Sequence, residues 1–533
     1  MADLQLVDVS IRDGNQSLWG ATGLRTGQIL QIAPVLDRAG FRALDFTSST
    51  HMGVAVRTHR ENPWERIRLT HAATPHTPLQ FIGTGFRFIS WQTAHPEVMQ
   101  LIYDRLVACG ISRFIVLDPM HDMAAVRRTA AMIAAAGGQE IVGALTYTVS
   151  EVHDDPFYAG LAGEMAACPD ITRVYVKDPA GLLTPERART LLPAVHARLA
   201  GKPLELHSHC TLGLSPLTYL AAPELGVSVL HTGCGPLASG TSLPDAQRTV
   251  ANLRELGHRV AVDGRALALA ADYFRRLAAA ESRPVGAPRE YDAAFLRHQV
   301  AGGVMTTMRR QLAELGLEDR FEAVIEEVSR VRAELGYPIM VTPFPQIVCS
   351  QALANVIGAA RYATVPDQVI RYVLGSFGRP TRPVDQEVAD RILALPRARE
   401  LRAEPPPPTV AELRARFPGA GDEEMLLRAV MPAAEVDAML AAGPARRHCN
   451  PDLQPVLDLL AGLATRSGLA ELTVSKPGFR LRLRSPADGE RSGRPGSQDR
   501  DGLQGRAGLQ GRDELQGRDG LQDPQHQEGS HAG

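Results

Sequence analysis

The chain has 533 residues and a formal net charge of -2 at pH 7. This length exceeds one ordinary hydrophobic core, so we expect two or three domains. The near-neutral charge gives no electrostatic argument for binding nucleic acid or a membrane surface. The N-terminus shows no secretory signal pattern, and no apolar stretch is long enough to cross a bilayer. The six cysteines are scattered without a CxxC pair, which favours a reduced, cytoplasmic protein.

The first half of the chain alternates short apolar runs with longer amphipathic stretches. Eight strand-helix units in about 250 residues are typical of a (β/α)8 barrel, also called a TIM barrel. A doubly wound open sheet is the alternative, but it usually has fewer strands, and RDGNQS does not match its Gly-rich first turn. The eight predicted strands lie at 4–11, 43–48, 79–85, 113–119, 141–148, 173–179, 203–209 and 227–233.

The composition changes along the chain and suggests four parts. We predict the α/β barrel over residues 1–262 and an α-helical domain over 263–450, where the pattern is mainly helical. Residues 451–485 carry a short helical pattern and then an alternating segment typical of a strand or hairpin. In residues 486–533, Leu-Gln recurs every six residues among Gly, Arg and Asp. Four such copies cannot bury a core, so this C-terminal tail is predicted to be disordered.

Four polar residues fall at the predicted C-terminal ends of barrel strands, the end where barrel enzymes place their chemistry. Asp13 follows the first strand, Lys177 ends the sixth, and His207 and His209 end the seventh. Residues two apart on a strand point the same way, so the two imidazoles project together. Each element alone has a structural explanation, such as a Lys177–Asp178 ion pair, but their joint occurrence favours a metal site. A lysine binds no cation when protonated, but it does so as a carbamate; the donor set suits Zn, Mn or Co.

Six motifs occur in one order over roughly residues 4–400: RDGNQSL, NPWERIR, VYVKDPAGLL, ELHSHCTLGL, HQVAGGVMTTMRRQL and GYPIMVTPFPQIVCSQALANV. Together they resemble the carboxyltransferase unit of biotin-dependent enzymes. Members are the carboxyltransferase domain of pyruvate carboxylase, the alpha subunit of oxaloacetate decarboxylase and the pyruvate-binding subunit of transcarboxylase. The resemblance implies a metal-dependent barrel, a helical domain that completes the site, and a homodimer.

The resemblance also implies roles for individual residues. Asp13, His207 and His209 fall on the family's metal ligands, and Lys177 falls on its carbamylated lysine.

Three further residues are implied to be catalytic. Gln16 matches a glutamine that contacts the keto acid, and Asp118 is retained in the motif RFIVLDP. Thr306 matches the hydroxyl that moves a proton between biotin and the substrate enol, although Thr at this position is also a common helix N-cap.

The chain departs from the family where the substrate carboxylate is bound. Thr84 and Ile115 stand where the family usually has arginines, and Asn15 replaces a histidine. A guanidinium holds a carboxylate best, so we expect Arg87 to bind the substrate in their place. A different carbonyl substrate is the alternative to pyruvate or oxaloacetate.

The sequence contains no lysine between methionines and no ATP-grasp motif, and Lys476 lies in Ser-Lys-Pro. We therefore expect biotin on a separate carrier protein and a separate biotin carboxylase, with a small 2-oxo acid as substrate. Two rival hypotheses stay open: a metal-dependent aldol-type lyase or synthase, such as hydroxymethylglutaryl-CoA lyase, and a non-catalytic scaffold subunit.

Overall fold

The computed structural model describes residues 1–90, 92–300, 302–314, 316–448, 471–476 and 479–484. The contacts divide the chain into two units, Met1–Asp458 and Leu459–Gly533. The predicted tail at 486–533 lies outside the described residues. In the second unit, the antiparallel strands β10 (Glu471–Lys476) and β11 (Phe479–Arg484) form a two-stranded sheet within the segment predicted as a strand or hairpin. Among the described residues, no helix has the length and apolar character needed to span a membrane.

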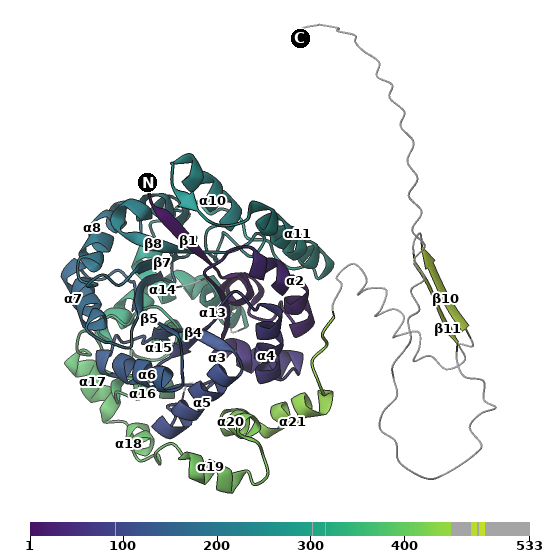
Figure 1. The fold of residues 1–533 in the computed structure, drawn as a ribbon. Coiled ribbons are helices and arrows are strands. Elements are labelled where there is room, and N and C mark those ends of the chain that lie inside the picture. Colours follow the sequence, from purple (N-terminus) through teal and green to yellow (C-terminus); the bar gives the residue numbers. More distant parts are fainter. Residues whose placement is uncertain (91, 301, 315, 449–470, 477–478, 485–533) are drawn as a thin grey trace, which may run out of the picture. The chain divides into compact units, whose positions relative to one another are not determined.

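The first unit is built on a closed parallel barrel, seen almost end-on in Figure 1. Each strand pairs with its neighbours in chain order, and β1 closes the ring by pairing with both β2 and β8. The barrel prediction and all eight predicted strands are therefore confirmed. The strands are β1 (Asp3–Asp8), β2 (Ala43–Ser48), β3 (Leu79–Thr84), β4 (Ile111–Leu117), β5 (Glu140–Thr146), β6 (Arg173–Asp178), β7 (Leu204–Ser208) and β8 (Val227–Thr232); the short β9 (Arg259–Val260) pairs with β1.

Helices surround the barrel, and side-chain caps or an N-terminal proline define where many of them begin. At α8, for example, Thr184 accepts the backbone N–H of Arg187 and Pro185 takes the first helical position. The main helices are α2 (Thr26–Arg38), α4 (Pro63–Ala73), α5 (Pro96–Ala108), α6 (Met123–Ala135), α7 (Asp155–Ala166), α8 (Pro185–His196), α9 (Ser215–Ala221), α10 (Ala246–Glu255) and α11 (Gly264–Ala280). Shorter elements are η1 (Ser10–Gly14), α1 (Asn15–Trp19), α3 (Ser49–Val54), η2 (Ala55–His59) and η3 (Ala222–Leu225).

The helical part after the barrel has two packing partners. Residues from Val300 to Leu401 form a core of their own, and Met120 of the loop after β4 inserts into it. The last three helices instead pack against the barrel's outer core, through residues such as Leu413 and Met439. The helices are α12 (Phe295–His298), α13 (Gly302–Glu314), η4 (Glu318–Arg320), α14 (Phe321–Glu334), α15 (Phe344–Ile357), α16 (Asp367–Val373), α17 (Gln386–Leu393), α18 (Pro396–Arg402), α19 (Val410–Arg416), α20 (Asp422–Val430) and α21 (Ala433–Ala442).

Alternation along β4 separates the outer core from the barrel interior. Phe114 and Val116 belong to the cluster that packs under the surrounding helices, whereas Ile115 and Leu117 belong to a separate apolar cluster with residues from β3, β5 and β6. Arg113, on the same face as Ile115, is fully buried. The barrel interior therefore combines an apolar cluster with buried charge.

A chain of buried polar side chains crosses the barrel interior. Arg113 Nη2 lies 2.5 Å from Glu205 Oε2, and its Nε donates to Gln80 Oε1 at 2.7 Å. Gln80 Nε2 donates in turn to Asp45 Oδ1 at 3.0 Å, and Arg12 Nε donates to Asp45 Oδ2 at 2.8 Å. Every charge in this layer has an oppositely charged neighbour, as burial demands. We call this set the inner polar layer; its members are Arg12, Asp45, Gln80, Arg113, Glu205 and His231.

Substitution of Arg113 by Ala is expected to destabilise the barrel strongly, because Glu205 would lose a guanidinium partner inside it. Removing one partner of a buried ion pair typically costs about 3–5 kcal/mol of unfolding free energy. The control is Arg127→Ala, since Arg127 and Glu164 form a pair that is about half exposed on both sides, worth at most about 1 kcal/mol. Urea titration followed by fluorescence measures both variants. Equal unfolding free energies of the two variants would show that the buried Arg113–Glu205 pair stabilises the barrel no more than an exposed ion pair does.

Candidate functional site

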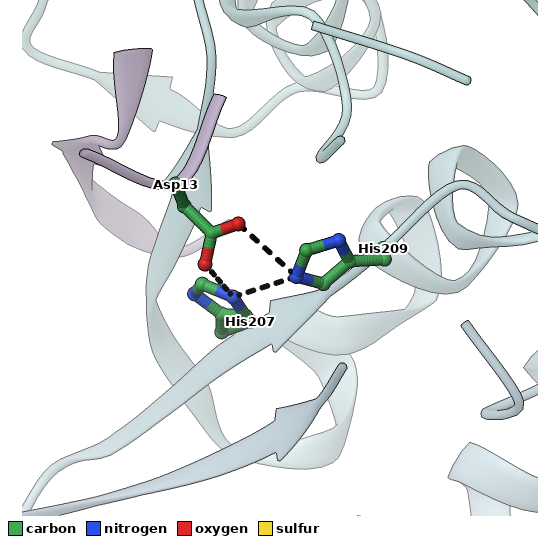
Figure 2. Close-up of side chains that lie close together, drawn as sticks. All are labelled: Asp13, His207 and His209. Atoms are coloured by element: carbon green, nitrogen blue, oxygen red, sulfur yellow. Dashed lines mark hydrogen bonds and ion pairs between the residues drawn. The ribbon is translucent and has the colours of Figure 1, made fainter. Parts of the chain in front are cut away.

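Three side chains converge at the C-terminal end of the barrel, as Figure 2 shows. Asp13 lies in the π-helical turn η1, which directly follows β1, whereas His207 lies on β7 and His209 just beyond it. Asp13 Oδ2 is 3.2 Å from His207 Nε2, and Asp13 Oδ1 is 3.4 Å from His209 Nε2. The two imidazole Nε2 atoms are 3.2 Å apart. The structure therefore brings together three of the four residues predicted to bind metal, with all three side chains buried.

Lys177 is the fourth member of this cluster. It ends β6, and its Nζ lies 3.0 Å from His207 Nε2 and 3.6 Å from Asp13 Oδ2. Two ligands that each lie about 2.1 Å from one ion are themselves about 3.0–3.4 Å apart at octahedral or tetrahedral angles. The spacing of the donor atoms Asp13 Oδ, His207 Nε2 and His209 Nε2 matches this range, so these residues fit a divalent ion.

Hydrogen bonds on the far side of each imidazole orient its free nitrogen toward the cluster. His209 Nδ1 lies 2.7 Å from the carbonyl oxygen of Thr241, so it carries the proton and leaves Nε2 with a lone pair. His207 Nδ1 contacts His231 Nδ1 at 3.2 Å, and His231 Nε2 contacts Glu205 Oε2 at 2.9 Å. Glu205 only accepts, so His231 donates to it and accepts from His207. Both cluster imidazoles thus present Nε2 as a metal donor, which is the usual arrangement around bound metals.

The electrostatics keep the cluster in ligand form. Burial alone would raise the pKa of Asp13, but Arg12, His209 and Lys177 hold it well below its usual range. Burial and the neighbouring Lys177 hold the pKa of His207 well below its usual value. Burial lowers the pKa of Lys177 to about 8, although Asp13 opposes this shift. Asp13 is therefore an ionised carboxylate and His207 a neutral imidazole. The Lys177 amine loses its proton much more readily than an ordinary lysine.

A cavity of about 220 Å³ adjoins the cluster. Its barrel side includes Asp13, Lys177 and His209, together with Gln16. Hydroxyl groups at the ends of β2 and β3 and in the segments directly after these strands supply much of the polar wall. The helical part contributes Met340, Val341, Thr342 and Pro345 to the wall. The hydroxyl-bearing residues of the barrel wall are Ser17, Ser48, Ser49, Thr50, Thr84 and Ser90.

Arg87 lines this cavity and also joins the barrel to the helical part. Its Nη2 donates to the carbonyl oxygen of Ser376 at 2.7 Å, and its guanidinium lies 4.8 Å from the centre of the Phe377 ring. Thr84 stands on the cavity wall, whereas Ile115 is buried in the apolar cluster of the barrel interior. Of the two positions where the family usually has an arginine, Thr84 therefore faces the cavity, whereas Ile115 packs in the barrel interior.

The two remaining predicted catalytic residues differ in what surrounds them. Asp118 accepts the backbone N–H groups of Met120 and Asp122 at 2.9 and 3.0 Å, so it shapes the turn after β4. It is not among the described residues that line the cavity. Thr306 belongs to α13, but its side chain lies outside the described part of the structure.

Comparison with known proteins identifies the family. Residues 295–439 match the family model described as the conserved carboxylase domain. A pyruvate carboxylase subunit of Methanocaldococcus jannaschii is 34% identical over 394 residues, which cover 73% of this chain and 68% of the relative. The chain belongs to the biotin-dependent carboxyltransferase family. It is thus a carboxyltransferase of a biotin-dependent enzyme, and the resemblance inferred from the six motifs is confirmed.

Two further comparisons bear on this carboxyltransferase. The 2-oxoglutarate carboxylase large subunit of Hydrogenobacter thermophilus is 28% identical over 507 residues, covering 92% of this chain and 77% of the relative. The carboxyl transferase domain of Rhizobium etli pyruvate carboxylase, solved with pyruvate, superimposes with a TM-score of 0.75 at 23% identity, covering 90% of this chain and 83% of that one. The latter shows the fold alone. The relatives do not favour the aldol-type lyase alternative.

The residues behind the candidate metal cluster were not predicted from the sequence. Glu205 and His231 both alternate with apolar residues on their strands and end up on the interior face. The charged residue within the apolar run of β7 was the available indication, because an inward charge in a barrel strand needs a buried partner.

Replacement of His231 by Ala is expected to weaken metal binding about 10–100-fold, because His207 would lose the acceptor that fixes its tautomer and ring orientation. Metal content after equilibrium dialysis against graded Zn or Mn measures this loss. His76→Ala is the matched control, since His76 is exposed and lies outside the cluster. If the metal affinity of the His231 variant were unchanged, His231 would not position His207 for metal binding.

Proposed function

We propose that this carboxyltransferase moves a carboxyl group between carboxybiotin, carried on a separate protein, and a pyruvate-like 2-oxo acid. The observation that supports it most is the metal-type cluster of Asp13, Lys177, His207 and His209, three of whose members line a cavity of about 220 Å³. A biotin carboxylase would charge the carrier. The relatives named above carry the names of two different 2-oxo acids, pyruvate and 2-oxoglutarate. The homodimer and the cytoplasmic location stay predictions.

Asp13, His207, His209 and carbamylated Lys177 would hold a divalent ion, either Zn, Mn or Co. When bound, the ion would supply Lewis-acid stabilisation of negative charge on the substrate's carbonyl oxygen. The lowered pKa of Lys177 supports the carbamate, because only the neutral amine adds CO2.

The other cavity residues would bind and orient the substrate. Arg87 would pair with the substrate carboxylate through its guanidinium, and the Gln16 amide would donate to the keto acid. The apolar side chains of Met340, Val341 and Pro345 would keep water away from the enolate, which water would otherwise protonate.

Thr306 would carry the proton between the two partners. The Thr306 hydroxyl would give its proton to the ureido nitrogen of biotin once CO2 has left that nitrogen. The oxygen of Thr306 then takes a proton from the substrate carbon next to the carbonyl. The resulting enolate carbon attacks CO2 and forms the new C–C bond, so no proton is gained or lost overall.

The activity is tested by decarboxylation of oxaloacetate by the purified, metal-loaded chain, with and without free biotin. We expect release of pyruvate that depends on biotin, since free biotin accepts the carboxyl group in place of the carrier. Oxalosuccinate, the carboxylated form of 2-oxoglutarate, serves as the second substrate. If neither acid is decarboxylated by protein with full metal content, the 2-oxo acid proposal is wrong.

Lys177→Ala is expected to lose most of the bound metal and the biotin-dependent activity, because the fourth donor is gone. The wild type in 13C-bicarbonate should show a carbamate resonance that the variant lacks. For a pKa of about 8, about one amine in ten is neutral at pH 7 and about nine in ten at pH 9. Metal uptake by metal-free protein should therefore quicken as pH rises over this range. Full metal content in the variant would contradict the carbamate.

Arg87→Ala is expected to raise the KM for the 2-oxo acid about 10–100-fold, because a charge-assisted hydrogen bond contributes about 1.5–3 kcal/mol. Arg87→Lys should leave the KM nearly as high as in the Ala variant, since lysine lacks the planar guanidinium that binds a carboxylate through two hydrogen bonds. Phe377→Leu is the control: it removes the ring beneath the guanidinium but leaves the guanidinium itself. A similar KM change in Phe377→Leu would mean that Arg87 acts by holding the helical part in place.

A further inference from the structure

A second, larger cavity lies away from the metal cluster. Its volume is about 650 Å³, within the range of about 300–1,000 Å³ that is usual for small-molecule sites. One wall comes from the loop before α2 and from the start of that helix. The others come from the end of η2 and the two residues after it, from the end of α11 and the residues after it, and from Ala442 at the end of α21 together with residues 443–446 and 448. None of the residues assigned to the carboxyltransferase site lines it. We call it the peripheral pocket.

Positive charge dominates the lining of the peripheral pocket. Arg25, Arg60 and Arg446 line it, and their guanidiniums have no ion-pair partner among the described residues. A fourth guanidinium, that of Arg283, is paired with Glu281 at 3.2 Å. Guanidiniums stay protonated at any physiological pH, so the charge is permanent.

Both carboxylates in the lining are already engaged. Glu61 Oε2 accepts from Arg66 Nη2 at 2.7 Å and from the backbone N–H and hydroxyl of Thr26 at 2.9 and 2.6 Å. Glu281 accepts from Gln28 as well as from Arg283. Because both carboxylates are already paired, the three guanidiniums without an ion-pair partner give the pocket lining a net positive charge.

His59 is an unsatisfied polar residue in the pocket lining. It ends the π-helical turn η2 and lines the pocket, and both of its ring nitrogens are shielded from solvent without a hydrogen-bond partner among the described residues. Buried polar atoms normally find partners, so the ring is left unsatisfied here. Because both nitrogens are closed to solvent, they would reach a bound molecule only after the ring turned toward the pocket. Burial and the guanidiniums of Arg66, Arg25 and Arg283 together lower the pKa of His59 to about 4, although Glu61 opposes this shift. The neutral ring has one donor and one acceptor.

The backbone beside His59 is unusual as well. Arg60 adopts the left-handed conformation, with φ of 54° and ψ of 41°, directly after the π-helical turn. Both features are uncommon for ordinary residues and occur preferentially at functional sites. Here they place His59 and Arg60 in consecutive positions on one wall of the pocket.

We propose that the peripheral pocket binds a multiply charged organic anion of about nucleotide size, with phosphate or carboxylate groups held by Arg25, Arg60 and Arg446. Arginine suits this role because its planar fork matches both phosphate and carboxylate oxygens. The volume exceeds what inorganic phosphate alone would fill, so the ligand carries an organic body.

Isothermal titration calorimetry of the full chain with ADP and with citrate tests the proposal, in 150 mM KCl to suppress weak surface binding. Adenosine is the uncharged control for ADP. We expect a Kd below about 1 mM for at least one anion and no detectable binding of adenosine. Binding of ADP alone would identify a phosphate ligand, and binding of citrate alone a carboxylate ligand. Failure of both anions at 10 mM, or equal binding of adenosine and ADP, would overturn the proposal.

Two variants locate the binding. Arg60→Asn removes the guanidinium while keeping a residue that tolerates the left-handed backbone, and Arg446→Gln removes the charge of an exposed residue. Each should weaken anion binding at least tenfold. Arg189→Gln is the matched control, since Arg189 is exposed on α8 and does not line the pocket. Circular dichroism confirms that each variant is folded. Unchanged affinity in both pocket variants would place the anion elsewhere and refute the assignment.

Discussion

Charge compensation inside the barrel is the constraint on which the site depends. A carboxylate or guanidinium in this interior is tolerated only when an opposite charge and hydrogen bonds replace its water. The inner polar layer meets this condition by linking Arg12 at one end to Glu205 and His231 at the other. Its two ends touch Asp13 and His207, so the residues that orient the cluster also satisfy the buried charges of the fold.

The ion pairs that stabilise the barrel interior also fix the proton positions at the candidate site. Burial would raise the pKa of Glu205, but Arg113, His231 and Arg173 hold it well below its usual range. Glu205 therefore stays ionised and gives His231 a fixed acceptor, which in turn fixes the tautomer of His207. The proton positions at the cluster thus follow from ion pairs deeper in the barrel rather than from the cluster alone.

Much of the fold could be predicted from the sequence, because each barrel strand is a short apolar run and each is followed by a helical pattern. The placement of Asp13, Lys177, His207 and His209 could also be predicted, since parallel strands bring their C-terminal ends to one face. Contacts between segments that lie far apart in the sequence could not be predicted. The hydrogen bond from Arg87 to Ser376 spans 289 positions, and no local pattern indicates it.

Two other features lay beyond local patterns. The packing of α19–α21 on the barrel depends on which of two cores the apolar faces of these helices meet, and an amphipathic pattern does not specify its partner. The same limit applies to Ile115, which reads as an ordinary strand residue. The sequence comparison places Ile115 where the family usually has an arginine, but only the three-dimensional cluster shows that its side chain packs inside the barrel.

The cavity beside the cluster is built from two halves of the chain that have separate hydrophobic cores. The barrel supplies the reactive groups, and the segment from Met340 to Pro345 supplies part of the wall. The size and polarity of that wall can therefore change by substitution in the helical part, while the strands that carry the reactive groups keep their packing. The part of the cavity wall that can change independently of the barrel thus lies more than a hundred residues downstream of β8, at the start of α15 and just before it.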